Sequence, residues 1–91
     1  MPTEQELDLL RADILDVCQQ TRAMSEIVAH AQIKPHIQKI GDQRVREIIR
    51  SLADAGLLFS RGETLGVVYH TTALGRENIQ KYRNRKYLKP D

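Results

Sequence analysis

The sequence predicts one mainly α-helical domain with a small β-hairpin near its C-terminal end. Its 91 residues are too few to build two cores of ordinary size. Apolar residues recur with helical spacing over the first half of the chain, and two short β-prone runs follow. With 41% hydrophobic and 29% charged residues, the composition is that of a folded chain rather than a disordered one.

A first helix is expected over about residues 4–20. Thr3 and Glu6 have the spacing of a capping box, in which each side chain bonds the backbone amide of the other residue. The apolar stripe expected to face the core consists of Leu7, Leu10, Ile14, Val17 and Cys18. Three further apolar residues lie outside this stripe or at its edge: Leu9, Ala12 and Leu15. They predict a second apolar surface on this helix.

A short second helix is expected over about residues 26–32, with Ser25 as its N-cap. A break is expected near Lys34, because the residue before a proline avoids helical angles. One more turn is expected over residues 33–40, with Pro35 in its first position.

The clearest helix of the sequence starts with Asp42 as its cap. Its apolar stripe consists of Val45, Ile48, Ile49 and Leu52. Gly56 is expected to end it in the left-handed conformation that glycine adopts without strain.

Two strands are expected after this helix, over Leu57–Arg61 and Val67–Thr71, with the glycine-bounded loop 62–66 between them. Thr72 is then expected to cap a last helix over about residues 73–87. The residues expected on its inner side are Leu74, Ile79 and Tyr82.

Charge is unevenly distributed along the chain, although the net charge is only +2. Residues 1–20 carry five acidic residues and one basic residue, whereas residues 61–91 carry seven basic and three acidic residues. Residues 21–60 carry six basic and four acidic residues. This gradient suits a polyanionic partner on one side of the molecule.

The sequence also suggests where the protein works. No stretch approaches the roughly 20 apolar residues that span a membrane, and the acidic N-terminal segment lacks the layout of a signal peptide. The lone Cys18 has no partner for an internal disulfide. We therefore expect a cytoplasmic protein without a membrane partner.

Two stretches of the sequence resemble known regulators. RVREIIRSLADAGLLFSRG (44–62) resembles the recognition helix and first wing strand of MarR-, PadR- and ArsR-like proteins, and VVYHTTALGRENIQKYR (67–83) resembles their second wing strand and last helix. Thr72 and Gly75 stand at the Thr and Gly positions of that pattern, whereas Thr71 replaces the usual Leu. The resemblance, to no single family, implies a winged helix-turn-helix fold. The segment 32–41 is longer than the usual turn of the motif, and the extra dimerisation helices of larger families are missing.

In such proteins the helix that here begins near residue 42 enters the major groove of DNA. The side chains that its apolar stripe leaves pointing outward or to the flanks are Gln43, Arg44, Arg46, Glu47 and Arg50. Arg pairs with guanine, and Gln with adenine, through two parallel hydrogen bonds. The alternative is a solvated helix face with ion pairs between residues one turn apart.

Three further basic regions are candidate contacts to the DNA backbone. Arg61 in the wing is expected near the phosphates or in the minor groove. Lys34, His36 and Lys39 are expected near phosphates, and the basic run 81–89 is a candidate arm along DNA. For each region an ordinary solvated hairpin, loop or helix end is the alternative.

Catalysis is not expected. The sequence contains no phosphate-binding loop, CxxC pair or HExxH motif. Cys18 and the histidines at 30, 36 and 70 match no standard metal-ligand spacing, and Cys18 is expected to be a small buried hydrophobe. The sequence therefore predicts no enzyme, no cofactor and no metal site.

These features predict a transcriptional regulator that binds double-stranded DNA. A homodimer is expected, because one such domain covers only a short half-site. Its interface is expected to use Leu9, Ala12, Leu15, Tyr87 and Leu88. Two other functions stay open: a protein–protein interaction module or subunit of a larger assembly, and a nonspecific DNA-coating protein.

Overall fold

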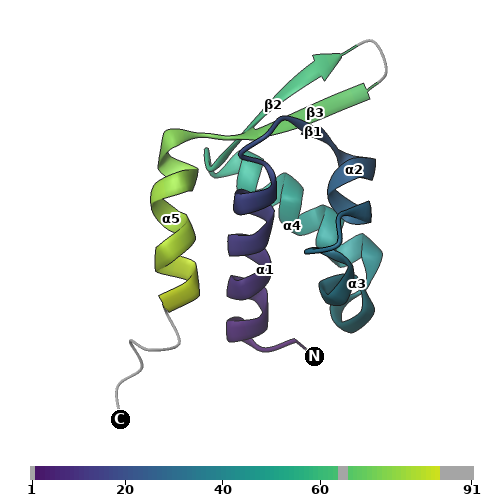
Figure 1. Cartoon of the computed structure of the whole chain (residues 1–91), viewed down its shortest axis with the longest axis vertical. Coiled ribbons are helices and arrows are strands. Elements are labelled where there is room, and N and C mark those ends of the chain that lie inside the picture. The colour runs from purple at the N-terminus through teal and green to yellow at the C-terminus, as the bar shows by residue number, and fades with distance from the viewer. Residues whose placement is uncertain (1, 64–65, 85–91) are drawn as a thin grey trace.

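The computed structural model describes residues 2–63 and 66–84. Within these ranges the chain is mainly helical, with a three-stranded antiparallel sheet across one end of the helices (Figure 1). The elements are α1 (Glu4–Val17), β1 (Arg22–Ala23), α2 (Met24–Ala29), α3 (Lys34–Ile40), α4 (Asp42–Asp54), β2 (Leu58–Glu63), β3 (Gly66–Thr71) and α5 (Ala73–Asn84). The predicted class, mainly α with a small β-hairpin, is confirmed. No helix in the described ranges is long and apolar enough to cross a membrane.

Helix α1 begins as the capping box predicts. The backbone N–H of Glu6 donates to Oγ1 of Thr3 at 3.1 Å, and the backbone N–H of Thr3 donates to Oε1 of Glu6 at 3.1 Å. The helix ends at Val17, three residues earlier than expected. The carbonyl of Cys18 instead accepts from the backbone N–H of Thr71 at 2.9 Å, so the chain leaves the helix where it meets β3.

Both apolar surfaces of α1 are covered by the chain itself. The predicted stripe is buried, and α5 packs along the helix as well (Figure 1). Ala12 and Leu15 are 0% exposed, so the expectation that they meet a second copy is wrong. Leu9 is half-buried. The second apolar surface therefore belongs to the domain core, because α1 has helices on two sides.

Two helix starts in the middle of the chain differ from the prediction. Helix α2 begins at Met24, one residue before Ser25, and the backbone N–H of Ala23 donates to Oε1 of Glu26 at 2.7 Å. Ser25 is exposed inside the helix and is not its cap. Helix α3 is present, with Pro35 second rather than first among its residues.

Helix α4 begins one residue before its expected start. Asp42 is its first helical residue, and Gly41, with φ of 102°, takes the cap position. The carboxylate of Asp42 pairs with Arg46 and does not cap the helix. At the other end Gly56 has φ of 81°, which confirms the predicted left-handed conformation.

The sheet has the order β1-β3-β2. The hairpin of β2 and β3 was predicted, but its register was not: the structure places Phe59 opposite His70 and Arg61 opposite Val68. Strand β1 was not predicted; its two residues, Arg22 and Ala23, pair with Tyr69 and Val68. Two residues are too few for an alternating pattern, so this strand has no signal in the sequence.

Thr72 caps α5 as predicted. Its Oγ1 accepts from the N–H of Gly75 at 3.0 Å and donates to the carbonyl of Gly56 at 2.8 Å. Gly75 is buried, and a Cβ there would collide with the carbonyl oxygen of Leu57. The inner face of α5 therefore includes Gly75 and Ile79, and Tyr82 packs partly against the core.

The expectation that Leu74 faces inward is wrong, because its side chain is 49% exposed. Gly75 fixes the rotation of the helix against Leu57, which turns the preceding residue toward solvent. The described part of α5 ends at Asn84, and the expected last turn to residue 87 lies outside the described residues.

Candidate nucleic-acid interface

The outward face of α4 is the first candidate surface. The predicted stripe of this helix is buried. The opposite side exposes Gln43, Arg44, Glu47 and Arg50. This face offers two guanidinium groups and one amide, which are the groups that make paired hydrogen bonds with bases, beside one carboxylate.

Arg46 differs from the other two arginines of α4. Its Nε lies 2.7 Å from Oδ2 of Asp42, one turn earlier in the same helix, and both side chains are partly exposed. A surface pair of this kind stabilises a helix by only about 0.3–0.5 kcal/mol. The charge of Arg46 is therefore compensated locally, by a pair that a phosphate could displace at small cost.

The two lysines before α4 lie on a helix rather than in a loop. Lys34 and Lys39 are both exposed on α3. Hydrogen bonds with the backbone and hydroxyl of Thr3 lower the pKa of Glu6, and the charge of Lys39 lowers it further. Lys39 therefore has an acidic neighbour at the start of α1, whereas Lys34 stands at the start of α3.

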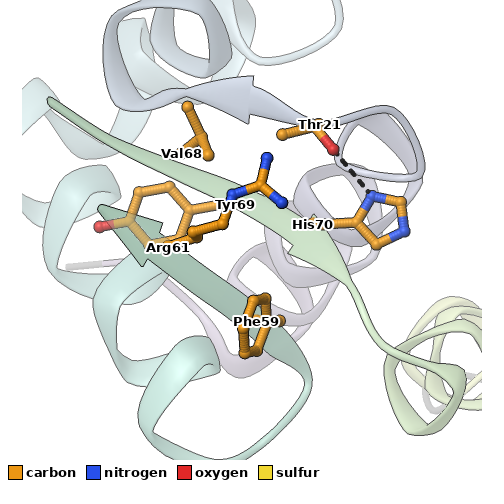
Figure 2. A pocket seen from close by; sticks show the side chains of 6 residues that line it. All are labelled: Thr21, Phe59, Arg61, Val68, Tyr69 and His70. Carbon is orange, nitrogen blue, oxygen red and sulfur yellow. Dashed lines mark hydrogen bonds between the residues drawn. The ribbon is translucent and has the colours of Figure 1, made fainter. Parts of the chain in front are cut away.

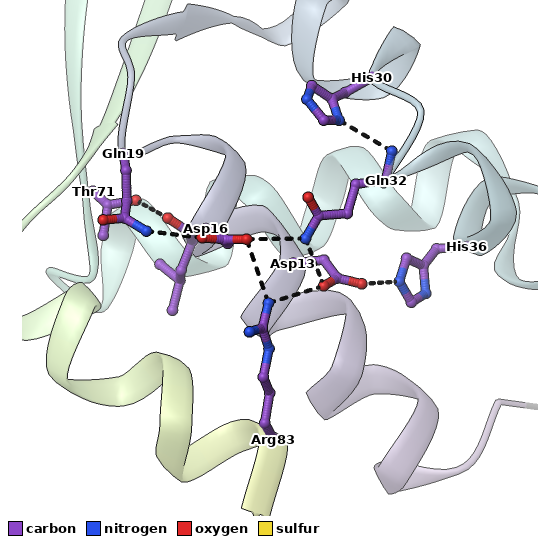
Figure 3. Close-up of polar contacts among 9 residues, drawn as sticks. Asp13, Asp16, Gln19, His30, Gln32, His36, Thr71 and Arg83 are labelled. Carbon is purple, nitrogen blue, oxygen red and sulfur yellow. Dashed lines mark hydrogen bonds and ion pairs between the residues drawn. The ribbon is translucent and has the colours of Figure 1, made fainter.

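His36 makes a contact within the protein. Its Nε2 lies 2.7 Å from Oδ2 of Asp13, and its side chain is mostly buried. The same carboxylate accepts from Nε2 of Gln32 at 2.9 Å and from the guanidinium of Arg83 at 3.3 Å (Figure 3). The histidine therefore ties α3 to α1, a role that the sequence did not predict, and its expected contact to phosphate stays a prediction.

This polar cluster also compensates part of the acidic charge of α1. Asp16 accepts from Gln32 at 3.2 Å and from Arg83 at 3.5 Å, beside the contacts of Asp13 (Figure 3). Burial raises the pKa of Asp13, but the hydrogen bonds from His36 and Gln32 and the charges of His36 and Arg83 outweigh it and lower the pKa below 3.8. The cluster joins α1, α3 and α5. Sequence alone gave no sign of it, since its members lie up to 70 residues apart.

Arg61 is exposed on β2 and lies over the outer face of the sheet. It lines an open hollow of about 260 Å³ together with Thr21, Phe59, Val68, Tyr69 and His70. Figure 2 shows its guanidinium in front of β3, on the same side as Thr21 and His70. Strand alternation indicates that Phe59 and Arg61 share a face, but the sequence does not show which residues stand opposite them.

The remaining predicted contacts lie apart from these surfaces. Leu9, on α1, is the one described residue of the predicted dimer interface that is not fully buried. Tyr87 and Leu88, and the basic residues from Arg85 to Lys89, lie outside the described residues.

In the part of the chain that the structure describes, no group of three or more His, Cys, Asp or Glu side chains is arranged so that it could hold a metal ion. Cys18 is buried, and burial raises the pKa of its thiol to about 12. The thiol therefore stays protonated and packs as a small apolar group, as predicted.

Comparison with known proteins adds no relative: no family model, no curated protein and no solved structure matches this chain.

Proposed function

We propose that the chain is a winged helix-turn-helix domain that binds double-stranded DNA as a transcriptional regulator. The order of its elements supports this fold, with α1, α2 and α4 before the hairpin of β2 and β3, and α5 after it. Helix α3 occupies the long connection before α4. In this proposal α4 enters the major groove and the hairpin is the wing.

The observation that carries the proposal is that α4 has one apolar, buried side and one polar, exposed side. Four apolar residues anchor one side of this helix in the core, and the other side exposes Arg44, Arg50 and Gln43. A helix held this firmly presents its outward side chains in a fixed geometry, which base recognition requires. Lys34 and Arg61 are exposed on neighbouring elements, where they add phosphate contacts.

The test measures binding of the protein to labelled duplex fragments of mixed sequence by fluorescence anisotropy over a series of salt concentrations. If about four phosphates are neutralised, log K falls with log salt at a slope of roughly −3 to −4. We expect the double variant Arg44→Ala, Arg50→Ala to bind much more weakly than the wild type.

The matched control removes positive charge elsewhere. Arg76 is exposed on α5, so the variant Arg76→Ala tests whether any lost positive charge weakens binding. We expect it to bind nearly as the wild type does. A folded protein that binds no duplex at low salt would contradict the proposal, and equal losses from α4 and α5 would reduce it to nonspecific DNA coating.

A protein–protein interaction module is the second candidate function. It is favoured by three large apolar side chains that are exposed in the described structure: Phe59, Val67 and Leu74. The charges of α4 favour it too, because Glu47 stands on the same outward face as the arginines. A folded protein without duplex binding would support this function instead.

We propose further that two copies act together in the cytoplasm, since a single domain covers only a short half-site. Among the described residues that were expected in the dimer interface, Leu9 is the one whose side chain is accessible to solvent. The dimer proposal therefore depends on a smaller apolar contribution from α1 than the sequence predicts.

A further inference from the structure

The outward face of α4 carries a carboxylate that simple attraction to DNA does not explain. Glu47 lies one turn after Arg44 and one turn before Arg50, and all three side chains are exposed. At about 100° per residue, Glu47 stands nearly opposite the buried stripe of the helix, so it is central on this face. Phosphates repel a carboxylate, so Glu47 weakens any binding that depends on charge alone.

Glu47 has no role in holding the helix together. Asp42, the acidic residue at the start of α4, pairs with Arg46 at 2.7 Å. Among the residues that the structure describes, Glu47 takes part in no hydrogen bond or ion pair, and the same holds for Arg44 and Arg50. Both arginines lie three residues from Glu47, a spacing at which ion pairs form on helices. The face therefore offers two uncompensated guanidinium groups and one uncompensated carboxylate.

A carboxylate can match only some of the base edges in the major groove, because it accepts hydrogen bonds and donates none. Cytosine and adenine present amino groups there, whereas guanine and thymine present acceptor atoms. Adenine also presents its N7 acceptor beside the amino group, and this atom repels a carboxylate. The amino group of cytosine has no acceptor of the same base beside it in the groove. Cytosine is therefore the base that Glu47 matches best.

The arginines beside Glu47 complement the neighbouring base pair. Residues three apart lie about 4.5 Å apart along a helix axis, and stacked base pairs lie about 3.4 Å apart. When Glu47 meets one base pair, Arg44 or Arg50 therefore stands near the next one. Arginine bonds guanine through two parallel hydrogen bonds.

We propose that Glu47 determines sequence specificity by accepting a hydrogen bond from the N4 amino group of a cytosine, beside a guanine bound by Arg44 or Arg50. This inference rests on the proposed duplex binding by α4 and adds the kind of site that is bound. At other bases the carboxylate faces an acceptor atom and opposes binding. Glu47 thus contributes discrimination between sequences rather than attraction to DNA.

The experiment selects preferred duplexes for the wild type and for Glu47→Gln from a library with a random core, and measures their affinities by fluorescence anisotropy. A glutamine amide bonds adenine through two hydrogen bonds. One selected position should therefore change from cytosine in the wild type to adenine in Glu47→Gln, while the neighbouring guanine stays.

A second measurement uses the duplex that the wild type selects. Replacing the cytosine at this position by thymine, with adenine opposite, exchanges the amino donor for an acceptor. This replacement should weaken binding of the wild type roughly 5- to 150-fold, which corresponds to about 1–3 kcal/mol. Binding of Glu47→Ala should change less than about twofold, because the group that senses the replacement is gone.

Glu77→Gln is the matched control, because it removes the same charge from an exposed position of α5. It should select the same duplexes as the wild type. Circular dichroism of each variant shows whether it is folded.

Three results would overturn this inference while duplex binding stands. They are a wild type that selects no cytosine, a Glu47→Gln protein that selects the same sequence as the wild type, and equal strengthening of all duplexes by Glu47→Gln and Glu77→Gln. The last result would make Glu47 an ordinary solvated charge. A folded wild type that binds no duplex would instead contradict the proposed function, and this inference with it.

Discussion

His36 on α3 and Asp13 on α1 are joined by a contact of 2.7 Å between Nε2 and Oδ2. Arg83 of α5 reaches the same carboxylate, so three helices meet at one charged group (Figure 3). Helix α3 leads through Gly41 directly into α4. The contact therefore helps to fix where the proposed recognition helix begins, although none of its members faces outward with Arg44 and Arg50.

Asp13→Asn should make stability less sensitive to acid. The pKa of Asp13 is lowered below 3.8 in the folded protein, so the unfolded chain takes up a proton first as the pH falls. The stability that Asp13 contributes is present above pH 3.8 and is lost as the pH drops through the lower folded value. Urea unfolding at a series of pH values should show a smaller loss below pH 4 for Asp13→Asn than for the wild type. Parallel curves for the two proteins would contradict this assignment.

His36→Ala should raise the pKa of Asp13 and destabilise the fold. The change removes a hydrogen bond to a charged, partly buried group, which costs about 1–3 kcal/mol. NMR titration of the Asp13 carboxyl carbon measures the pKa, and urea unfolding measures the stability. Lys39→Ala is the control on the same helix, because Lys39 is exposed. An unchanged Asp13 pKa in His36→Ala would show that the contact has no energetic role.

Gly75→Ala should destabilise the protein although alanine is the better helix former. The new Cβ would collide with the carbonyl oxygen of Leu57 and with the side chain of Thr71, so α5 must move off the sheet. Overpacking of this kind costs about 1–3 kcal/mol. Gly62→Ala is the matched control, since a Cβ there meets nothing within 4 Å. Thermal unfolding compares the two variants, and equal midpoints would mean that α5 does not pack this closely on Leu57.

Arginine variants should separate reading of sequence from positioning on the backbone. Arg44→Ala or Arg50→Ala should cost about 1–3 kcal/mol on preferred duplexes and relax the preference, if that side chain contacts a base. Arg61→Ala should weaken all duplexes about equally and make the salt slope shallower by roughly one. Selection from random duplexes, followed by anisotropy, measures both effects. Uniform weakening by all three changes would leave a protein that binds DNA without reading it.

Leu9→Glu should give a folded monomer that binds duplex DNA more weakly. Leu9 is half-buried, and in the proposed dimer the added charge would lie in the apolar contact between the two copies. Light scattering measures the molecular mass of the variant in solution, and circular dichroism shows whether it is folded. Gln5→Glu adds the same charge at an exposed position of α1 and should leave the association unchanged. A wild type that is monomeric at high micromolar concentration, and still binds DNA tightly, would remove the dimer from the proposal.

The sequence by itself determined those features that depend on neighbouring residues. The capping box of Thr3 and Glu6, the left-handed Gly56 and the cap at Thr72 each require only a few residues at fixed spacing. The buried stripe of α4 follows from its period in the same way. These local rules sufficed for the class of fold and for the outward face of α4, where the candidate arginines lie.

Only the tertiary structure decided the features that join distant segments. Ala12 and Leu15 are buried because α5 returns along α1, which no pattern within α1 could show. Ser25 does not cap α2, because Ala23 pairs with Val68 in the sheet and thereby becomes the residue just before the helix. The Asp13–His36 contact, the exposure of Leu74 and the register that places Phe59 opposite His70 arise in the same way. Periodicity tells which side of an element is apolar, but the packing of other elements decides which side is covered.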